Sequence, residues 1–197
     1  MHIDFGTGDG AFVLRHARAS AETLVIGVDA NAANLRESSH RARRKPARGG
    51  LCNALFGRLS LDEAPGELGA IAHTLTVLLP WGSLLKAVAL PAPAPLHRLL
   101  ELCAPTGRFR FVFGYDVTAE PSVGLDPSLP PLDVPGALAR LARRYAEVGV
   151  AATIRALSLD EVRALPTTWA QKLAIAGRKR TFVEVSGDPP VIAGGKS

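Results

Sequence analysis

A short segment near the start of the chain, DFGTGDG, places two carboxylates among the closely spaced glycines Gly6, Gly8 and Gly10. Glycines in such a turn adopt left-handed backbone angles and let the main chain approach a ligand closely. The spacing is G-x-G-x-G, whereas dinucleotide sites use G-x-G-x-x-G and keep a helix N-terminus clear for a pyrophosphate. Because Asp4 and Asp9 bring negative charge to that point, the segment favours a cationic ligand over a diphosphate.

Two further acids follow apolar segments that read as strands. Asp29 ends TLVIGVDA, a position from which a carboxylate can accept two hydrogen bonds from a ribose diol, and Asp62 comes after the next strand, where a polar side chain could meet an adenine. Each acid taken singly is more often a cap or turn residue. In this order, however, residues 1–115 resemble the class I S-adenosylmethionine-dependent methyltransferases, which implies that cationic cofactor. The residues expected to bind it are Asp4, Gly6, Thr7, Gly8, Asp9, Gly10, Asp29, Ala30, Asp62, Glu63, Leu79 and Ser83.

The chain has two tryptophans, and both are predicted to lie in loops. Trp81 follows Pro80 at the end of the apolar run TVLLP, and Trp169 lies in LPTTWAQKLA. Ligands of doubly wound sheets bind beyond the carboxyl ends of the strands, so Trp81 would stand where a methyl acceptor arrives. Two rings from separate loops can grip a flat ring on both faces, since stacking on a nucleobase contributes about 1–3 kcal/mol per base. The alternative is that both rings simply pack beneath their loops.

Positive charge is concentrated in two parts of a chain whose net charge is +5. Six basic residues lie between Arg36 and Arg48, against Glu37 as the one acid there, and a second group lies within residues 172–180. Two such clusters on one face would be the electrostatic footprint of a polyanion. Two ordinary solvated surfaces would account for the same charges.

The segments that must position these residues alternate between strand and helix. Strands are expected at the start of residues 2–19 and within 23–30, 51–60, 71–80, 107–115, 150–158 and 180–187. Helices are expected in the second half of 2–19 and within 31–45, 84–90, 96–104, 136–149 and 159–165. This order predicts an α/β fold with a doubly wound, mostly parallel, seven-stranded sheet. We expect one domain, residues 1–197, with a basic linker at 36–50, an insertion or lid at 116–136 and a target loop at 165–180.

Composition excludes several other classes. Hydrophobic residues make up 47% of the chain, which supports a core rather than disorder. Cys52 and Cys103 show neither metal spacing nor a disulfide framework, and the histidines are expected to be structural or exposed, so no metal site is expected. We find no charged-then-apolar leader and no apolar run of about 18 residues, and therefore expect a cytoplasmic protein that does not span a membrane.

Four segments carry a closer resemblance: DFGTGDG, IGVDANAANLRESSHRARRKPARGGLCNALF, TVLLPWGSLL and PTTWAQKLAIAGRKRTF. In this order they resemble the 16S rRNA adenine-N1 methyltransferases that confer aminoglycoside resistance by modifying a decoding-site adenine of helix 44. The resemblance implies 16S rRNA within the 30S subunit as partner, and a flipped adenine held by the catalytic residues Trp81, Trp169 and Pro80. The RNA-binding residues that it implies are Arg41, Arg43, Arg44, Lys45, Arg48, Thr168, Lys172, Arg178 and Arg180.

The resemblance leaves two alternatives open and has one departure. Members of that family carry an N-terminal β-hairpin before the first strand, and this hairpin is expected to be missing from the given sequence, because Asp4 already belongs to that strand: either the true start lies upstream or the hairpin is absent. A protein of the same fold could instead methylate a small molecule, with residues 120–135 as a lid over an enclosed pocket. A third possibility is an rRNA-binding homologue with impaired catalysis. We also expect a monomer.

Overall fold

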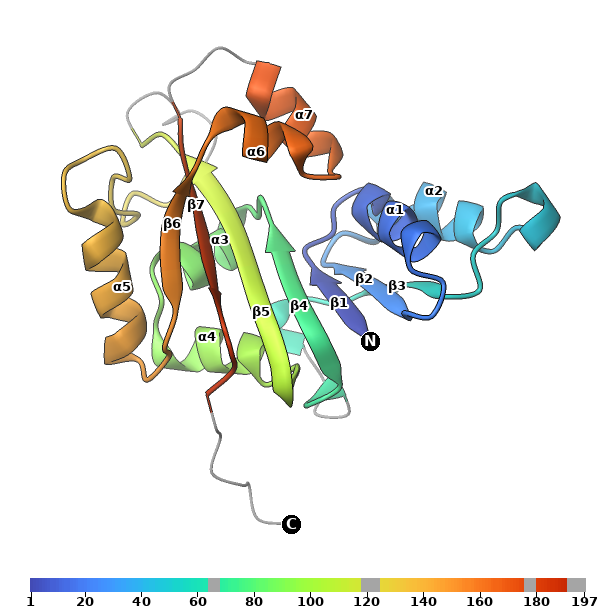
Figure 1. Cartoon of the computed structure of the whole chain (residues 1–197), viewed down its shortest axis with the longest axis horizontal. Helices are drawn as coiled ribbons and strands as arrows, with labels where there is room; N and C mark the ends of the chain where they lie inside the picture. The colour runs from blue at the N-terminus through green and yellow to red at the C-terminus, as the bar shows by residue number, and fades with distance from the viewer. Residues whose placement is uncertain (64–67, 118–124, 176–179, 191–197) are drawn as a thin grey trace.

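The computed structural model describes residues 1–63, 68–117, 125–175 and 180–190, with residues 172–175 described by their backbone alone. Within these residues one seven-stranded sheet has the strand order β3-β2-β1-β4-β5-β7-β6 (Figure 1). The strands are β1 His2–Phe5, β2 Val25–Asp29, β3 Ala54–Arg58, β4 Ala72–Leu78, β5 Cys103–Tyr115, β6 Thr153–Leu157 and β7 Thr181–Gly187.

Strands β1 to β5 run parallel to one another, and β7 runs antiparallel to both of its neighbours, β5 and β6. The predicted mostly parallel, seven-stranded sheet is therefore confirmed. The strand order reverses between β1 and β4, which are hydrogen-bonded neighbours. In open α/β sheets a ligand binds at this reversal, beyond the carboxyl ends of the two strands.

Helices cover both faces of the sheet. One apolar cluster joins α3, α4 and α5 to one face, and a second joins α1, α6 and α7 to the other. Strand β5 shows why two clusters form: Phe111 and Phe113 belong to the first and Val112 to the second, because successive side chains of a strand point to opposite faces. The helical segments are α1 Ala11–Ala19, α2 Ala32–Ala42, η1 Pro46–Arg48, η2 Leu61–Glu63, α3 Gly82–Ala89, α4 Pro93–Leu100, α5 Ala137–Glu147, α6 Leu159–Ala164 and α7 Thr168–Ile175.

The main departure from the predicted elements lies between α4 and β5. The helix expected over residues 96–104 ends at Leu100, and β5 begins at Cys103 instead of residue 107. Cys103 pairs with Ala72 of β4, just before a shift in the register of the two strands. A long-range pairing thus recruits residues whose local pattern resembles a helix. Cys103 is buried, whereas Cys52 is exposed.

The described part of segment 116–136 lies against α3 and β5. Leu129 and Leu132 are buried in the core, and the Tyr115 hydroxyl donates a hydrogen bond of 2.7 Å to the carbonyl oxygen of Pro130. Lys86 of α3 forms an ion pair of 2.7 Å with Asp126. These contacts hold residues 125–132 on the side of α3.

Candidate active site

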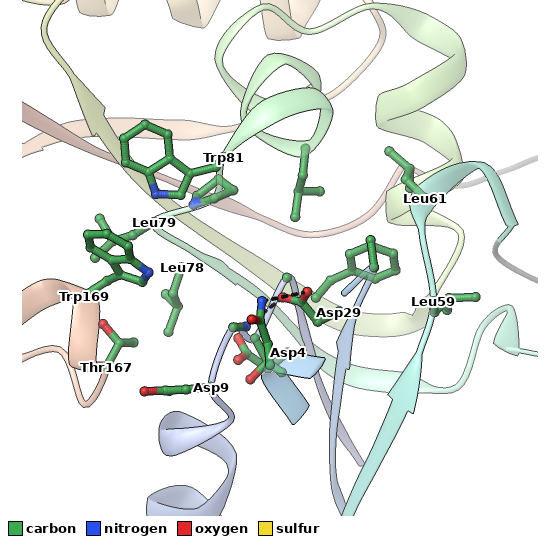
Figure 2. A pocket seen from close by; sticks show the side chains of 18 of the residues that line it. Asp4, Asp9, Asp29, Leu59, Leu61, Leu78, Leu79, Trp81, Thr167 and Trp169 are labelled. Atoms are coloured by element: carbon green, nitrogen blue, oxygen red, sulfur yellow. Dashed lines mark hydrogen bonds between the residues drawn. The ribbon is translucent and has the colours of Figure 1, made fainter. Parts of the chain in front are cut away.

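A cavity of about 270 Å³ opens at the carboxyl ends of β1, β2 and β4 (Figure 2). Its size is close to the lower end of the range of small-molecule sites, about 300 Å³. In the described part of the chain no group of three metal-binding side chains occurs, and no helix is long and apolar enough to cross a membrane. Predicted site residues that line the cavity are Asp4, Gly6, Thr7, Gly8, Asp9, Asp29, Ala30, Leu79, Pro80, Trp81, Ser83, Thr168 and Trp169.

The turn between β1 and α1 forms the floor of the cavity. Gly6 has a φ of +75°, and a Cβ added there would lie 2.5 Å from the Cδ2 atom of Leu84, so only glycine fits without a shift. The Gly8 amide donates to the Asp29 carboxylate at 2.9 Å, which ties the turn to β2. Gly10 does not line the cavity, and a Cβ added there would lie 2.5 Å from the Phe56 ring and 2.8 Å from the Cβ atom of Ser38, so the position is close-packed.

Asp4 is the buried acid of the cavity, with 2% of its surface exposed. Its carboxylate accepts a hydrogen bond of 2.6 Å from the Thr76 hydroxyl. Burial raises the pKa of Asp4 to about 6, and the negative charge of Asp29 adds to this shift. A buried carboxylate of this kind is stabilised when a cation approaches it. The floor of the cavity therefore fits the cationic end of S-adenosylmethionine.

Asp29 is held by the backbone around it. One carboxylate oxygen accepts from the Asn31 amide at 2.9 Å and from the Asn34 side chain at 3.4 Å. Asn34 itself lines the cavity, which the sequence did not single out. It stands in the first turn of α2, five residues after the acid that ends β2, and this spacing from Asp29 is the signal that would have found it. With the bond from the Gly8 amide, three of the roughly four acceptor positions of the carboxylate are used, and the contact to a ribose stays a prediction.

Asp62, predicted to meet an adenine, does not line the cavity. Asp62 points outward, with 88% of its side chain exposed, and lies 3.3 Å from Arg98. Glu63 likewise pairs with Arg58 at 3.6 Å, and neither acid lines the cavity. The reason is the short helix η2, which turns the chain so that residues 59–61, Leu59, Ser60 and Leu61, line the cavity in place of the acids.

The two tryptophans meet at the mouth of the cavity (Figure 2). Their ring centroids are 6.1 Å apart, and the ring planes are tilted by 51°. Trp81 is the N-cap residue of α3. Trp169, predicted to lie in a loop, is instead the second residue of helix α7, whose Ala170 amide donates to the Thr167 hydroxyl at 3.0 Å. The structure thus brings together two residues that are 88 positions apart in the chain.

Leu79 gives Trp81 its direction. Its φ of +54° lies in the left-handed region, which costs a non-glycine residue about 1–3 kcal/mol. A hydrogen bond of 2.7 Å from the Leu79 amide to the Val112 carbonyl oxygen holds this conformation. The chain therefore leaves β4 with a sharp turn at the point where Pro80 and Trp81 reach the mouth of the cavity.

The predicted RNA-binding residues differ in where they lie. Those of the basic linker are exposed, at the C-terminal end of α2 and in η1, and no ion pair joins them to an acid of the described residues: Arg41, Arg43, Arg44, Lys45 and Arg48. Thr168 begins α7 and lines the cavity. Arg180 is half-buried, and burial lowers its pKa while Asp116 opposes that shift, so it is not an open surface cation. Arg178 and the side chain of Lys172 lie outside the described residues.

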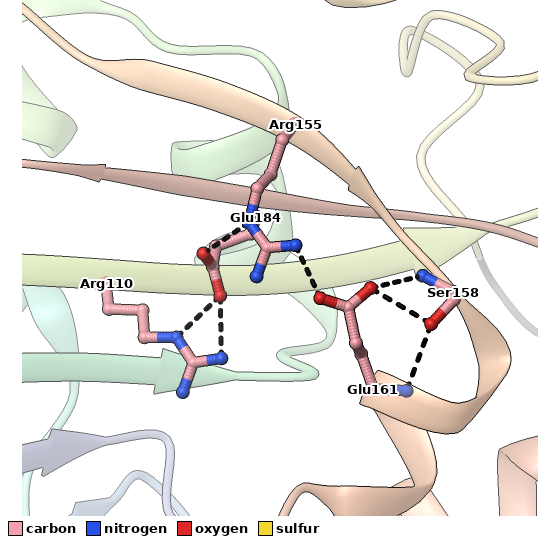
Figure 3. A network of polar contacts seen from close by, with 5 residues as sticks. All are labelled: Arg110, Arg155, Ser158, Glu161 and Glu184. Carbon is pink, nitrogen blue, oxygen red and sulfur yellow. Dashed lines mark hydrogen bonds and ion pairs between the residues drawn. The ribbon is translucent and has the colours of Figure 1, made fainter.

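An ion-pair network connects the sheet to α6, the helix that packs against the helix of Trp169 (Figure 3). Glu184 of β7 pairs with Arg110 of β5 at 2.6 Å and with Arg155 of β6 at 2.9 Å. Arg155 also reaches Glu161 at 2.6 Å, and Glu161 forms a capping box with Ser158 at the start of α6. Helix α6 packs against α7. The network therefore holds the pair of helices that places Trp169 at the cavity.

Replacing Glu184 by glutamine is expected to lower the free energy of unfolding by about 1–3 kcal/mol, because two arginines lose their shared carboxylate. For a chain of this length that corresponds to a fall of about 2–12 °C in the melting temperature, measured by calorimetry. Asp160→Asn is the matched control, since Asp160 is 89% exposed in its pair with Arg163 and is expected to change little. Equal melting temperatures for both variants would contradict the prediction.

Comparison with known proteins gives a consistent result. Residues 1–187 match the family model described as NpmA: 16S rRNA (adenine(1408)-N(1))-methyltransferase. The 16S rRNA (adenine(1408)-N(1))-methyltransferase of Escherichia coli is 33% identical over 191 residues, which cover 95% of this chain and 86% of that protein. The aminoglycoside resistance methyltransferase NpmB1 is 35% identical, with a TM-score of 0.74 over 94% of this chain and 86% of that structure. A tryptophan-to-alanine mutant of the Catenulisporales acidiphilia 16S rRNA (adenine(1408)-N(1))-methyltransferase, solved with its cosubstrate SAM, is 27% identical, with a TM-score of 0.81 over 99% of this chain and 88% of that one.

Proposed function

The chain belongs to the 16S rRNA (adenine(1408)-N(1))-methyltransferase family, and from this membership we propose that Trp81 and Trp169 hold the target adenine above a methyl donor bound in the cavity. The enzyme transfers a methyl group from S-adenosylmethionine to N1 of a decoding-site adenine of 16S rRNA. The observation that carries the proposed clamp is the pair of indole rings at the mouth of the cavity, with centroids 6.1 Å apart.

The clamp must open slightly to admit a base. Stacked carbon atoms lie about 3.5–4 Å apart, so a base between two parallel rings needs about 7–8 Å. The rings of Trp81 and Trp169 therefore have to separate by about 1–2 Å and become parallel. Trp169 is 47% exposed and stands in the first turn of its helix, so it has room for this movement.

The cavity residues are proposed to bind and orient rather than to exchange protons with the base. When bound, S-adenosylmethionine supplies a methyl group made electrophilic by its sulfonium sulfur. Adenine N1 attacks with its own lone pair, so no general base is needed, and the methylated ring becomes positively charged. Asp4 and Asp29 would hold the donor, while Pro80 would shape the edge beside the adenine amino group. Correct placement of two reactants contributes about 7–11 kcal/mol, the main effect asked of this site.

We propose that the enzyme acts as a monomer without a metal on the 30S subunit in the cytoplasm. The basic linker lies at the end of the sheet that carries α2, where its exposed cations can reach the RNA backbone (Figure 1).

Reverse transcription across helix 44 tests the proposed function. A methyl group on N1 blocks the Watson–Crick edge, so 30S subunits incubated with the protein and S-adenosylmethionine should give a new stop at the decoding-site adenine. Cells that express the protein should also tolerate higher aminoglycoside concentrations. Absence of a stop, under conditions in which the Escherichia coli relative produces one, would refute the proposal.

Removing three linker cations is expected to weaken binding to the 30S subunit by about 100-fold at physiological salt. The triple change Arg41→Ala, Arg44→Ala and Lys45→Ala should also reduce the slope of log affinity against log salt by about 3, one per lost phosphate contact. The matched control is Arg143→Ala, because Arg143 is exposed on α5, far from α2 along the sheet (Figure 1). An unchanged salt slope in the triple variant would show that this linker does not dock on RNA.

A further inference from the structure

A row of polar side chains runs from Asp4 away from the cavity and into the protein. The Thr76 hydroxyl lies 2.6 Å from the Asp4 carboxylate and 3.0 Å from Nε2 of His2. The other ring nitrogen of His2, Nδ1, lies 3.3 Å from Nε2 of His16 on α1. Asp4, Thr76 and His2 are all buried, with 2%, 4% and 5% of their surfaces exposed. Buried polar groups of this kind are costly unless each has a partner.

The hydrogen atoms can be arranged in only one way when Asp4 is ionised. A hydroxyl has one hydrogen, and Thr76 donates it to Asp4. The contact of 3.0 Å therefore requires Nε2–H of His2 as the donor. A neutral His2 then accepts at Nδ1, so His16 must donate. Every hydrogen bond in the row points toward the Asp4 carboxylate, and bonds aligned in this way polarise one another.

Resting on the proposed function, we propose that Thr76 and His2 are positioning residues for the methyl donor: their aligned hydrogen bonds keep Asp4 ionised and directed into the cavity, where it receives the cationic methionine portion of S-adenosylmethionine. Thr76 and His2 themselves do not line the cavity. Their effect reaches the donor through Asp4, the only member of the row that does line it among the described residues.

The charged groups around the row give the proposal a pH dependence. Burial and the charge of Asp29 raise the pKa of Asp4 to about 6, and the side chains of Thr7 and Thr76 oppose that rise. The pKa of His2 is lowered to about 4 by burial and by the nearby His16, so His2 stays neutral. Protonation of Asp4 removes its attraction for a cation. Affinity for S-adenosylmethionine should therefore fall as the pH decreases through the region of this pKa.

Calorimetric titration of the full chain with S-adenosylmethionine between pH 5.5 and 8.5 tests the proposal. Thr76→Val removes the hydroxyl at nearly constant shape, and should weaken binding about tenfold at pH 7, the effect of one hydrogen bond to a charged group. The pH at which affinity falls should move upward. Thr76→Ser should restore the wild-type profile, and Thr74→Val, on the same face of β4, should leave it unchanged. His2→Leu should shift the profile in the same direction as Thr76→Val, and His2→Gln, which keeps a donor, should shift it less.

The outcomes separate this inference from the proposed function. If the wild-type protein binds S-adenosylmethionine but Thr76→Val and His2→Leu keep both its affinity and its pH profile, the positioning role is refuted and the methyltransferase function stands. If the wild-type protein does not bind S-adenosylmethionine at any pH, the assignment of the cavity to the methyl donor fails, and the inference fails with it. Should Thr76→Val not fold, the comparison of His2→Leu with His2→Gln gives the same decision.

Discussion

Replacing Trp169 by alanine is expected to slow methylation of 30S subunits at least about 100-fold, with little change in the affinity for S-adenosylmethionine. The variant loses one stacking face, worth about 1–3 kcal/mol, from an interaction that must offset the few kcal/mol needed to flip a base. The adenine, stacked on Trp81 alone, is also less well oriented for methyl transfer. Because Trp169 is 47% exposed while α7 packs through the buried Ala170, the fold should survive. Single-turnover methylation at saturating cofactor measures the effect.

The other half of the clamp provides the control for this prediction. Trp81→Ala should show a similar loss, and the double variant should lose much less than the product of the two single losses, because one ring alone cannot hold the base on both faces. Trp169→Phe, which keeps a smaller stacking face, should recover part of the rate. A wild-type rate in Trp169→Ala alone would show that the adenine stacks on Trp81 and that Trp169 only packs beside it.

The parts of the site that could be predicted are those encoded by neighbouring residues. The turn DFGTGDG, the acid that ends β2 and the Pro80–Trp81 step after β4 each contain their own signal: glycines with an acid, an apolar run with a polar end, or a run broken by proline. The fold followed from the order of such runs. The structure then adds the distance between the two tryptophans, which no local pattern could supply.

The predicted site residues that do not line the cavity are those whose side-chain position is decided by packing. Asp62 is next to residues that line the cavity, but a turn of η2 rotates it toward Arg98. Gly10 belongs to the glycine-rich turn, yet it faces Phe56 and Ser38. The contact between Thr76 and His2 could not be predicted for a related reason. The sequence around a threonine or histidine in an apolar strand does not show which side chains face it from adjacent strands.

Replacing Asp4 by asparagine is expected to make the free protein more stable and unable to bind its cofactor well. The pKa of Asp4 is raised in the folded state, so the ionised form opposes folding: stability is lost as the pH rises from the unfolded value toward about 6, and the full penalty applies at neutral pH. Removing the charge should therefore add about 1–3 kcal/mol at pH 7.5, or about 2–12 °C in melting temperature. The same change should weaken S-adenosylmethionine binding about 100-fold or more, because a buried cation loses its carboxylate.

Melting temperatures measured at increasing concentrations of S-adenosylmethionine test the effects on stability and on cofactor binding in one experiment. The wild-type protein should melt below Asp4→Asn without cofactor and above it once the cofactor is well in excess, since about 100 times the dissociation constant adds about 2.7 kcal/mol. Asp160→Asn is the matched control: Asp160 has 89% of its side chain exposed and does not line the cavity, so its change should alter both quantities little. If Asp4→Asn melts below the wild-type protein in the absence of cofactor, Asp4 serves the fold. If the curves cross as expected, the buried charge is a cost to folding that is compensated when the cationic donor binds.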